Sequence, residues 1–359
     1  MKVALIGRSS SYKVPGGDTI QMVKTAEAVN RLGIQADIFL SSEKIAYPEY
    51  DLLHFFNLLR PADHLWHIRK SKKPYVISTI YLDYTAFDRY GRSLPYRFLF
   101  RALGKHGSEY FKNLYRFARR QDKLVSTDYT AGHRKAMLNI LAGASLILPN
   151  SGSEYRRLVS DTGYKGGYAI IPNGVDPEIF GAIPVVEERK KMVLCVGQVY
   201  GMKNQHMLIR ACKNLNVPLE IIGKSPPNHS GYLDYCRKIA GDKVSFFGFM
   251  PQDELIKHYS AAKVHALPSW FETTGLASLE AGAMGCNLVV GGRGGDTYDY
   301  FGDHAWYCDA RDQESLEVAL GQALGHASGP HLRDLILSEY TWQKAGEKTR
   351  DAYNKALNG

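Results

Sequence analysis

The chain has 359 residues, of which 45% are hydrophobic and 23% charged, with a formal net charge of +9. This length exceeds what one hydrophobic core usually holds, so two domains of an ordinary globular protein are expected. No apolar stretch approaches the roughly 18 residues needed to span a bilayer, which argues against a membrane-spanning helix. Five scattered cysteines without a Cys-x-x-Cys pair favour a reducing cytosol and indicate no metal site. The N-terminus breaks too soon for a secretory signal.

The chain opens with a strand–loop–helix–strand pattern. Residues 2–7 are expected to form a buried strand, residues 20–32 have apolar spacing typical of a helix, and residues 36–40 form a second strand. This order predicts a Rossmann-like domain, although Pro-Gly-Gly-Asp at 15–18 is not the dinucleotide fingerprint. Gly16 and Gly17 either form a simple turn or let the backbone approach a ligand.

Further buried strands are expected at residues 51–56, 75–81 and 144–151. Ligands of open α/β sheets bind beyond the carboxyl ends of the strands, which makes the polar residues there site candidates. His133 is a further candidate, although a lone histidine is more often structural or exposed. The candidates on this half of the chain are Gly16, Asn57, Tyr81, Asp83 and His133.

Residues 89–120 are basic, aromatic and compatible with helix. Such a segment can lie against an anionic membrane surface. It can equally be a helical pair with a buried aromatic face and a solvated basic face. A nucleic-acid interface is also open, but no nucleic-acid motif supports it, so no such partner is expected. We prefer the membrane interpretation.

The second half of the chain restarts the alternation of strands and helices. A polar stretch at residues 187–191 is expected to be a linker, and strands are expected at residues 192–197, 219–223 and 244–251, with a helix over 253–262. A second sheet of the same kind as the first is therefore predicted.

The stretch from Pro268 to Gly282 has the strongest chemical signal. A buried strand at 264–267 stops at Pro268, Thr273 or Thr274 can cap a helix, and the helix follows from Leu276. Glu272 then lies in the loop before the helix and Glu280 on its body. Two carboxylates beside a helix N-terminus suit a phosphorylated sugar, with carboxylates for hydroxyl groups and amides for phosphate. The alternative is a solvated loop acid and a surface helix acid.

This Glu-x7-Glu element, with Pro-Ser before it and Glu-Ala-x-Ala-x-Gly from Glu280 on, resembles the donor-site signature of the retaining family-4 nucleotide-sugar glycosyltransferases. Pro-Asn-Gly-Val-Asp at 172–176 also resembles that family. The resemblance implies an α/β GT-B fold, with two Rossmann-like domains facing each other across a cleft. Residues 1–180 would form the acceptor-side domain, residues 181–338 the nucleotide-sugar domain, and residues 339–359 a helix that crosses back to the first domain.

The resemblance also implies roles for individual residues. Glu272 and Lys203 would be catalytic, Glu280 would bind the ribose, and the amides of Gly275 and Leu276 would hold the diphosphate with Lys203. The chain departs from the family at Gln198, where an arginine is usual, and at Tyr81, where many members have histidine. Arg293 is either a substitute cation or a solvated loop residue. The implied donor-binding set is Gly17, Gln198, Lys203, Phe249, Met250, Glu272, Thr274, Gly275, Leu276, Glu280 and Arg293.

The implied activity is that of a retaining, metal-independent hexosyltransferase. It would move a sugar from a nucleotide-diphosphate sugar, its co-substrate, to a glycan or lipid-linked acceptor in cell-surface polysaccharide or glycolipid synthesis, with no cofactor. A cytoplasmic place is expected, and the membrane interpretation adds peripheral contact with the inner membrane face. Gln198 and Tyr81 motivate one alternative, a catalytically silent sugar-nucleotide-binding protein. A nucleotide-sugar isomerase on a similar scaffold is the third hypothesis.

Overall fold

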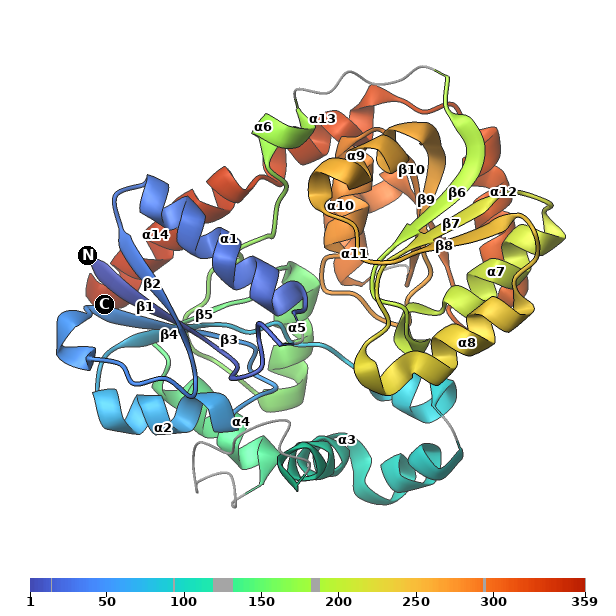
Figure 1. The fold of residues 1–359 in the computed structure, drawn as a ribbon. Coiled ribbons are helices and arrows are strands. Elements are labelled where there is room, and N and C mark those ends of the chain that lie inside the picture. The colour runs from blue at the N-terminus through green and yellow to red at the C-terminus, as the bar shows by residue number, and fades with distance from the viewer. Residues whose placement is uncertain (14, 93, 119–131, 182–187, 293–294, 359) are drawn as a thin grey trace. The chain divides into compact units, whose positions relative to one another are not determined.

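The computed structural model describes residues 1–13, 15–92, 94–118, 132–181, 188–292 and 295–358. The chain divides into two compact units. Unit 1 comprises Met1–Arg89, Ser93–Asn173 and Trp342–Gly359, and unit 2 comprises Tyr90–Arg92 and Gly174–Thr341. Each unit is a parallel sheet with helices on both faces (Figure 1). The predicted α/β class with two Rossmann-like units is confirmed. The units divide at residues 173 and 341, where the sequence analysis put boundaries at 180 and 338.

The sheet of unit 1 has the strand order β2-β1-β3-β4-β5 and all its pairings are parallel. The central strands are largely apolar because helices cover both faces, so no face is solvated and the sequence does not alternate between apolar and polar residues. The strands are β1 (Lys2–Gly7), β2 (Gln35–Leu40), β3 (Leu52–Phe56), β4 (Tyr75–Ser78) and β5 (Leu146–Leu148).

The last helix of the chain belongs to unit 1. α14 (Trp342–Asn358) packs along α1 (Gly17–Arg31), as Figure 1 shows. The two helices approach closely at Gly346, where an added Cβ would lie 2.7 Å from Cβ of Ala28. The C-terminal helix predicted over residues 339–359 is present and begins at Trp342. The other helices of this unit are α2 (Ala62–Ser71), α3 (Leu94–Ala118), α4 (His133–Gly143) and α5 (Gly152–Thr162), with short turns at Tyr47–Glu49 and Phe87–Gly91.

α3 carries the basic aromatic segment. Its helical course is interrupted at Gly104, whose φ of 65° and ψ of −172° are not helical. Side chains of the first half are described, and Leu94, Tyr96 and Phe98 are exposed there, while Phe100 is buried. The side chains of residues 111–118, and residues 119–120 altogether, lie outside the described part.

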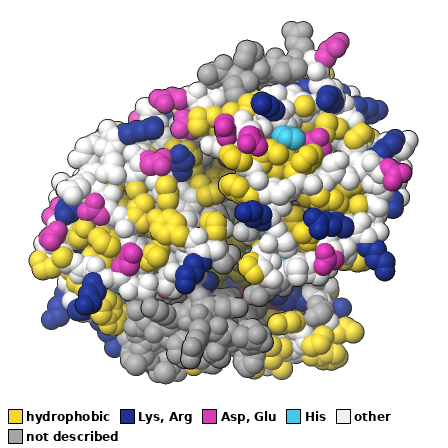
Figure 2. All heavy atoms as spheres, viewed as in Figure 1, with side chains coloured by type: hydrophobic (Ala, Val, Ile, Leu, Met, Phe, Trp, Pro, Cys, Tyr) yellow, Lys and Arg dark blue, Asp and Glu magenta, His cyan; other side chains and the backbone are white. Residues whose placement is uncertain are grey.

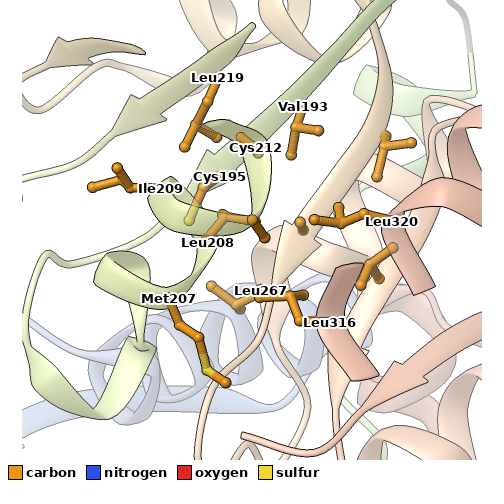
Figure 3. Close-up of a cluster of buried hydrophobic side chains, with 14 of the residues drawn as sticks. Val193, Cys195, Met207, Leu208, Ile209, Cys212, Leu219, Leu267, Leu316 and Leu320 are labelled. Atoms are coloured by element: carbon orange, nitrogen blue, oxygen red, sulfur yellow. The ribbon is translucent and has the colours of Figure 1, made fainter. Parts of the chain in front are cut away.

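The sheet of unit 2 has the strand order β11-β10-β9-β6-β7-β8, again with parallel pairings only. Val193 and Cys195 of β6 point to one face and pack with α7 and α12 (Figure 3), while Leu194 and Val196 point to the other. The strands are β6 (Lys190–Val196), β7 (Leu219–Ile222), β8 (Val244–Phe247), β9 (Ala262–Leu267), β10 (Asn287–Gly291) and β11 (Ala305–Cys308).

The helices of unit 2 cover both faces of this sheet (Figure 1). They are α6 (Pro177–Phe180), α7 (Gln205–Asn214), α8 (Ser230–Ile239), α9 (Gln252–Ala261), α10 (Leu276–Ala283), α11 (Asp296–Phe301), α12 (Gln313–Gly325) and α13 (Pro330–Glu339), with single turns at Gly201–Lys203, Pro227–His229 and Gly302–His304.

Several sequence-based expectations are wrong in detail. The strands expected at 144–151 and 244–251 extend only over Leu146–Leu148 and Val244–Phe247. The stretch 187–191 is not wholly a linker, because β6 already begins at Lys190; Glu187 itself lies outside the described residues. The strand expected at 75–81 ends at Ser78, because the buried carboxylate of Glu154 accepts a hydrogen bond from the Tyr81 amide at 2.8 Å and another from the Thr79 hydroxyl. No helix in the described part has the length and apolarity needed to cross a bilayer.

Candidate functional site

The carboxyl edge of the unit 2 sheet collects most of the residues that the sequence analysis assigned to the donor; Gly17 instead starts α1 in unit 1. All strands are parallel, so the loops after β6, β7, β8 and β9 meet at this edge. The loop after β6 carries Gln198 and Lys203, the loop after β8 carries Phe249 and Met250, and the loop after β9 carries Glu272. Arg293 lies outside the described residues.

Lys203 and Glu272 form an ion pair between two of these loops. The Lys203 ammonium donates to Oε1 of Glu272, and the two side chains are only 16% and 13% exposed. The backbone reinforces the link, since the amide of Trp270 donates to the carbonyl of Met202 at 2.9 Å. Burial and the Glu272 charge raise the pKa of the neighbouring Tyr200 phenol. The structure thus brings together the two residues predicted to be catalytic.

α10 begins at Gly275, whose φ of 71° is in the left-handed region that favours glycine. The expectation that Thr273 or Thr274 caps this helix is wrong. Gly275 takes the cap position without a side-chain bond, and the Thr274 hydroxyl donates to the Tyr300 hydroxyl at 3.2 Å. The Ser278 amide donates to the Gly275 carbonyl at 2.8 Å, whereas the amides of Leu276 and Ala277 come before the first acceptor of the helix. Within the described chain, the buried Ser278 hydroxyl of this first turn also has no hydrogen-bond partner. Donor groups therefore concentrate at this helix start.

Glu280 is held from the side by α9. Tyr259 donates its hydroxyl to Oε2 at 2.9 Å, and Gln252 donates its amide to Oε1 at 2.8 Å. Burial raises the pKa of Glu280, and these two hydrogen bonds lower it without cancelling the rise. Each carboxylate oxygen keeps a second lone pair for a ligand hydroxyl. Sequence reasoning missed Tyr259 and Gln252, because a contact between two helices leaves no local pattern.

The outer part of this edge carries Gln198, Phe249 and a residue that sequence reasoning missed, Lys224. The Gln198 carbonyl accepts from the Gln205 side chain at 2.9 Å, which fixes the loop after β6. Phe249 is 68% exposed, and the Lys224 ammonium lies 5.2 Å from its ring centroid. Met250 packs partly buried against the core. Lys224 follows β7 and one glycine. The rule that ligands bind beyond the carboxyl ends of parallel strands could therefore have identified it.

In unit 1, Gly16 and Gly17 form the start of α1. Asn57, which has a positive φ of 74°, donates to Oδ2 of Asp18 at 3.2 Å, and Arg8 donates to the same oxygen at 2.7 Å. Burial opposes ionisation of Asp18, but the charge and hydrogen bonds of Arg8, with the bond from Asn57, lower its pKa. The structure places Asn57 beside the Gly16–Gly17 loop, with an ionised Asp18 that the sequence analysis did not single out.

Tyr81 and Asp83 lie at the end of β4. The Tyr81 ring is fully buried, its hydroxyl donates to Asp161 at 2.9 Å, and the Lys105 ammonium lies 4.9 Å from the ring centroid. Lys105 also pairs with Asp161 and lies 3.7 Å from Asp83. Acceptor contact by Tyr81 stays a prediction, and the hydroxyl of this buried ring is directed to Asp161.

His133 is buried at the start of α4, away from the Gly16–Gly17 loop in sequence. Its Nε2 lies 3.2 Å from the Leu59 carbonyl and its Nδ1 lies 3.5 Å from Nδ1 of His106. Because a carbonyl only accepts, Nε2 carries the proton in this arrangement. Burial and the neighbouring His133, Lys105 and Arg134 lower the pKa of His106. A role for His133 toward an acceptor stays a prediction.

Comparison with known proteins shows which families and folds this chain is similar to. Residues 178–334 match the family described as glycosyl transferases group 1. A GDP-mannose-dependent alpha-(1-6)-phosphatidylinositol monomannoside mannosyltransferase of Mycolicibacterium smegmatis is 28% identical over 60% of this chain and 63% of its own length. A D-inositol 3-phosphate glycosyltransferase of Corynebacterium aurimucosum is 23% identical over 100% of this chain and 97% of its own. The first relatives are thus matched over about three fifths of their length.

Solved structures show the same fold. A sucrose-phosphate synthase of Thermosynechococcus elongatus superposes with a TM-score of 0.74 at 16% identity, covering 99% of each chain. Anabaena HepE in complex with UDP and glucose superposes with a TM-score of 0.69 at 13% identity, also covering 99% of each chain. The fold is therefore that of the GT-B class, as predicted. The family match lies in the half of the chain that carries the Glu-x7-Glu element, which was predicted to resemble a glycosyltransferase donor site.

Proposed function

We propose that this protein is a retaining, metal-independent family-4 glycosyltransferase that moves a hexosyl residue from a nucleotide-diphosphate sugar to a lipid-linked or glycan acceptor. The observation that carries the proposal is the Lys203–Glu272 ion pair beside the N-terminus of α10. It combines a cation and a helix terminus for a diphosphate with a carboxylate for sugar hydroxyls.

The ion pair explains how donor binding and leaving-group departure are coupled. Lys203 exchanges part of its contact with Glu272 for the diphosphate, and Glu272 accepts hydrogen bonds from the hydroxyls of the transferred sugar. When the bond from the anomeric carbon breaks, its electron pair stays on the diphosphate oxygen. The Lys203 ammonium and the amides of Gly275 and Leu276 stabilise that charge, the task that a divalent ion performs in other sites.

Glu280 fixes the nucleoside end of the donor. Tyr259 and Gln252 hold its carboxylate in one orientation, with free lone pairs for the ribose hydroxyls. The main chain at Phe249 and Met250 follows the neighbouring strand and lies along the base. The loops after β6, β8 and β9 then bind diphosphate, base and sugar, respectively.

An acceptor at a membrane surface is supported by α3. In its described half, Leu94 is 64% exposed, Phe98 is 65% exposed and Tyr96 is 49% exposed, with the exposed Arg101 on the same segment. Hydrophobic side chains gather there in the space-filling view (Figure 2). Exposed apolar and basic side chains on one helix suit an anionic lipid surface. The name of the M. smegmatis relative includes a phosphatidylinositol lipid, which supports a lipid-linked acceptor.

Donor hydrolysis tests the proposal. The purified protein is incubated with uridine-, guanosine- and adenosine-diphosphate sugars without acceptor, and donor loss is followed by NMR. We expect slow hydrolysis of one donor with retained configuration in the released sugar, unaffected by a metal chelator. Glu272→Ala should abolish it, while Glu254→Ala, an exposed acid on α9, should not. Binding without turnover would support the sugar-nucleotide-binding protein instead, and neither binding nor turnover would contradict both.

A further inference from the structure

Three neighbouring strands of unit 2 end in register at the donor edge. Val196 of β6 pairs with Ile222 of β7, and Ile222 pairs with Phe247 of β8. Because the strands are parallel, residues at equal distance beyond these partners lie side by side along the edge. The residues two positions beyond are, in strand order, Gln198, Lys224 and Phe249.

The backbone fixes Lys224 next to the loop after β6. An added Cβ on Gly223 would lie 2.0 Å from the carbonyl oxygen of Gly197, so the two strand ends approach more closely than any side chain would permit. The amide of Val199 donates to the carbonyl of Lys224 at 3.0 Å. The main chain of Lys224 is therefore held beside Gln198 and Val199.

The Lys224 ammonium has no anionic partner in the part of the chain that the structure describes. Its one described contact is the ring of Phe249, whose centroid lies 5.2 Å away. Lys203 differs, because its charge is already balanced by Glu272. A lysine that rests on an exposed ring keeps its charge available to a ligand, since a cation–π contact at an exposed site is weaker than a charge-assisted hydrogen bond.

The charges at this edge indicate that a diphosphate needs a further cation. A diphosphate brings a negative charge on each phosphate, whereas Gln198 adds no positive charge and Lys203 shares its charge with a carboxylate that stays in the site. Counting only residues that the structure describes, a diphosphate that meets Lys203 and the start of α10 alone leaves part of its charge unbalanced. Lys224 has a flexible four-carbon stem and three rotatable donors, which suits a phosphate as a point charge.

We propose that Lys224 binds the diphosphate of the nucleotide-sugar donor, its ammonium moving from the Phe249 ring to the phosphate oxygens. This proposal rests on the proposed function and adds a donor-binding residue outside the Glu-x7-Glu element. Lys224 and Lys203 then lie on neighbouring loops, and each ammonium binds part of the diphosphate.

Calorimetric binding of nucleotides tests this role. The probes are UDP and GDP, with uridine and guanosine as matched ligands that lack phosphate. Lys224→Met is compared with Lys238→Met, an exposed lysine on α8. We expect Lys224→Met to raise the Kd of the bound diphosphate about tenfold, as loss of a charge-assisted hydrogen bond does, and to leave the nucleoside Kd unchanged. Lys238→Met should match the wild type. Added salt should narrow the difference between Lys224→Met and wild type.

A second variant distinguishes a missing charge from a disturbed loop. Gln198→Arg in the Lys224→Met background places a new cation on the neighbouring loop and should recover most of the lost diphosphate affinity. Unchanged diphosphate affinity in Lys224→Met would overturn the proposal. So would an equal loss for diphosphate and nucleoside, which would assign Lys224 to the base through Phe249. Absence of nucleotide binding by the wild type would overturn the proposed function itself.

Discussion

The hydroxyl of Tyr353 lies 2.7 Å from Nδ1 of His54, although the two residues are 299 positions apart. Nε2 of the same histidine lies 2.9 Å from the Ser78 hydroxyl, and both Tyr353 and His54 are buried. The last helix of the chain is thus joined to the third and fourth strands of unit 1 through one imidazole. Buried polar groups of this kind define a unique packing only when every member has a partner.

Tyr353→Phe should destabilise unit 1. The change keeps the ring and leaves Nδ1 of His54 buried without a partner, which costs about 1–3 kcal/mol in the free energy of unfolding. Urea denaturation followed by a probe of unit 1 measures it. Tyr12→Phe, which removes the hydroxyl of a 58% exposed tyrosine, is the control and should change nothing. Equal stability of the two variants would show that the His54 bond contributes little.

Stability should fall as the pH drops below neutrality, because burial lowers the pKa of His54, His64 and His265 to about 3. Their unfolded pKa is near 6.5, so the unfolded chain binds more protons between these values and stability rises with pH in that window. Each histidine contributes up to about 1.4 kcal/mol per pH unit. Measurements of unfolding between about pH 5 and 6 give this slope while most carboxylates are still ionised.

His64→Leu isolates one of these contributions. Both ring nitrogens of His64 lack a hydrogen-bond partner within the described residues, and the ring lies 5.1 Å from that of Phe55. The variant removes a titrating group without breaking a hydrogen bond. The slope of the unfolding free energy against pH should decrease by the contribution of about one proton. The stability of the variant at neutral pH should equal or exceed that of the wild type. An unchanged slope would mean that His64 is protonated or unburied in the folded chain.

Gly275→Ala and Gly321→Ala should have opposite effects. The φ of 71° at Gly275 costs an L-residue roughly 1–2 kcal/mol, although an added Cβ would approach nothing closer than the Ser278 hydroxyl at 3.4 Å. Donor affinity should fall as well, because the amides at the start of α10 shift. Gly321 lies exposed within α12 with open space around it, so alanine there should stabilise by about 0.5–1 kcal/mol. Melting temperatures and donor titrations of both variants check the pair.

Much of the fold could be predicted because parallel strands covered on both faces are largely continuous apolar runs, as at residues 3–6 and 192–196. The spacing of Glu272 and Glu280 around a helix start is equally local, since glycine, helix periodicity and carboxylates all lie within one stretch. These features depend on residues that are neighbours in sequence.

The rest depends on contacts between distant segments. β4 ends early because Glu154, from α5, takes the hydrogen bonds of Thr79 and Tyr81. Thr274 fails to cap α10 because Tyr300 accepts its hydroxyl. Glu154 and Tyr300 are both distant in sequence from the residues that they contact. Local propensity alone therefore predicts too long a strand at 75–81 and assigns the cap of α10 to a threonine.

Membrane binding should depend on the exposed apolar residues of α3. Phe98→Ser removes a 65% exposed aromatic ring and should weaken sedimentation with vesicles of anionic phospholipid. Neutral vesicles should bind less, since the basic residues of the segment contribute through the surface potential. Val318→Ser, at a 53% exposed position on α12, serves as the control. Equal binding by both variants would assign the exposed face of α3 to something other than lipid.

Lys203→Met should separate stability from catalysis at the donor site. Removing the ammonium leaves the Glu272 carboxylate, whose side chain is 13% exposed, without its ion-pair partner. We expect a loss of about 1–3 kcal/mol in the free energy of unfolding, together with a roughly 10²–10³-fold lower donor turnover, since the leaving diphosphate loses a preorganised cation. The double variant Lys203→Met/Glu272→Gln restores charge balance and should regain most of the stability, but none of the turnover. Recovery of turnover in the double variant would mean that the ion pair only shapes the loops, and that the leaving group is stabilised elsewhere.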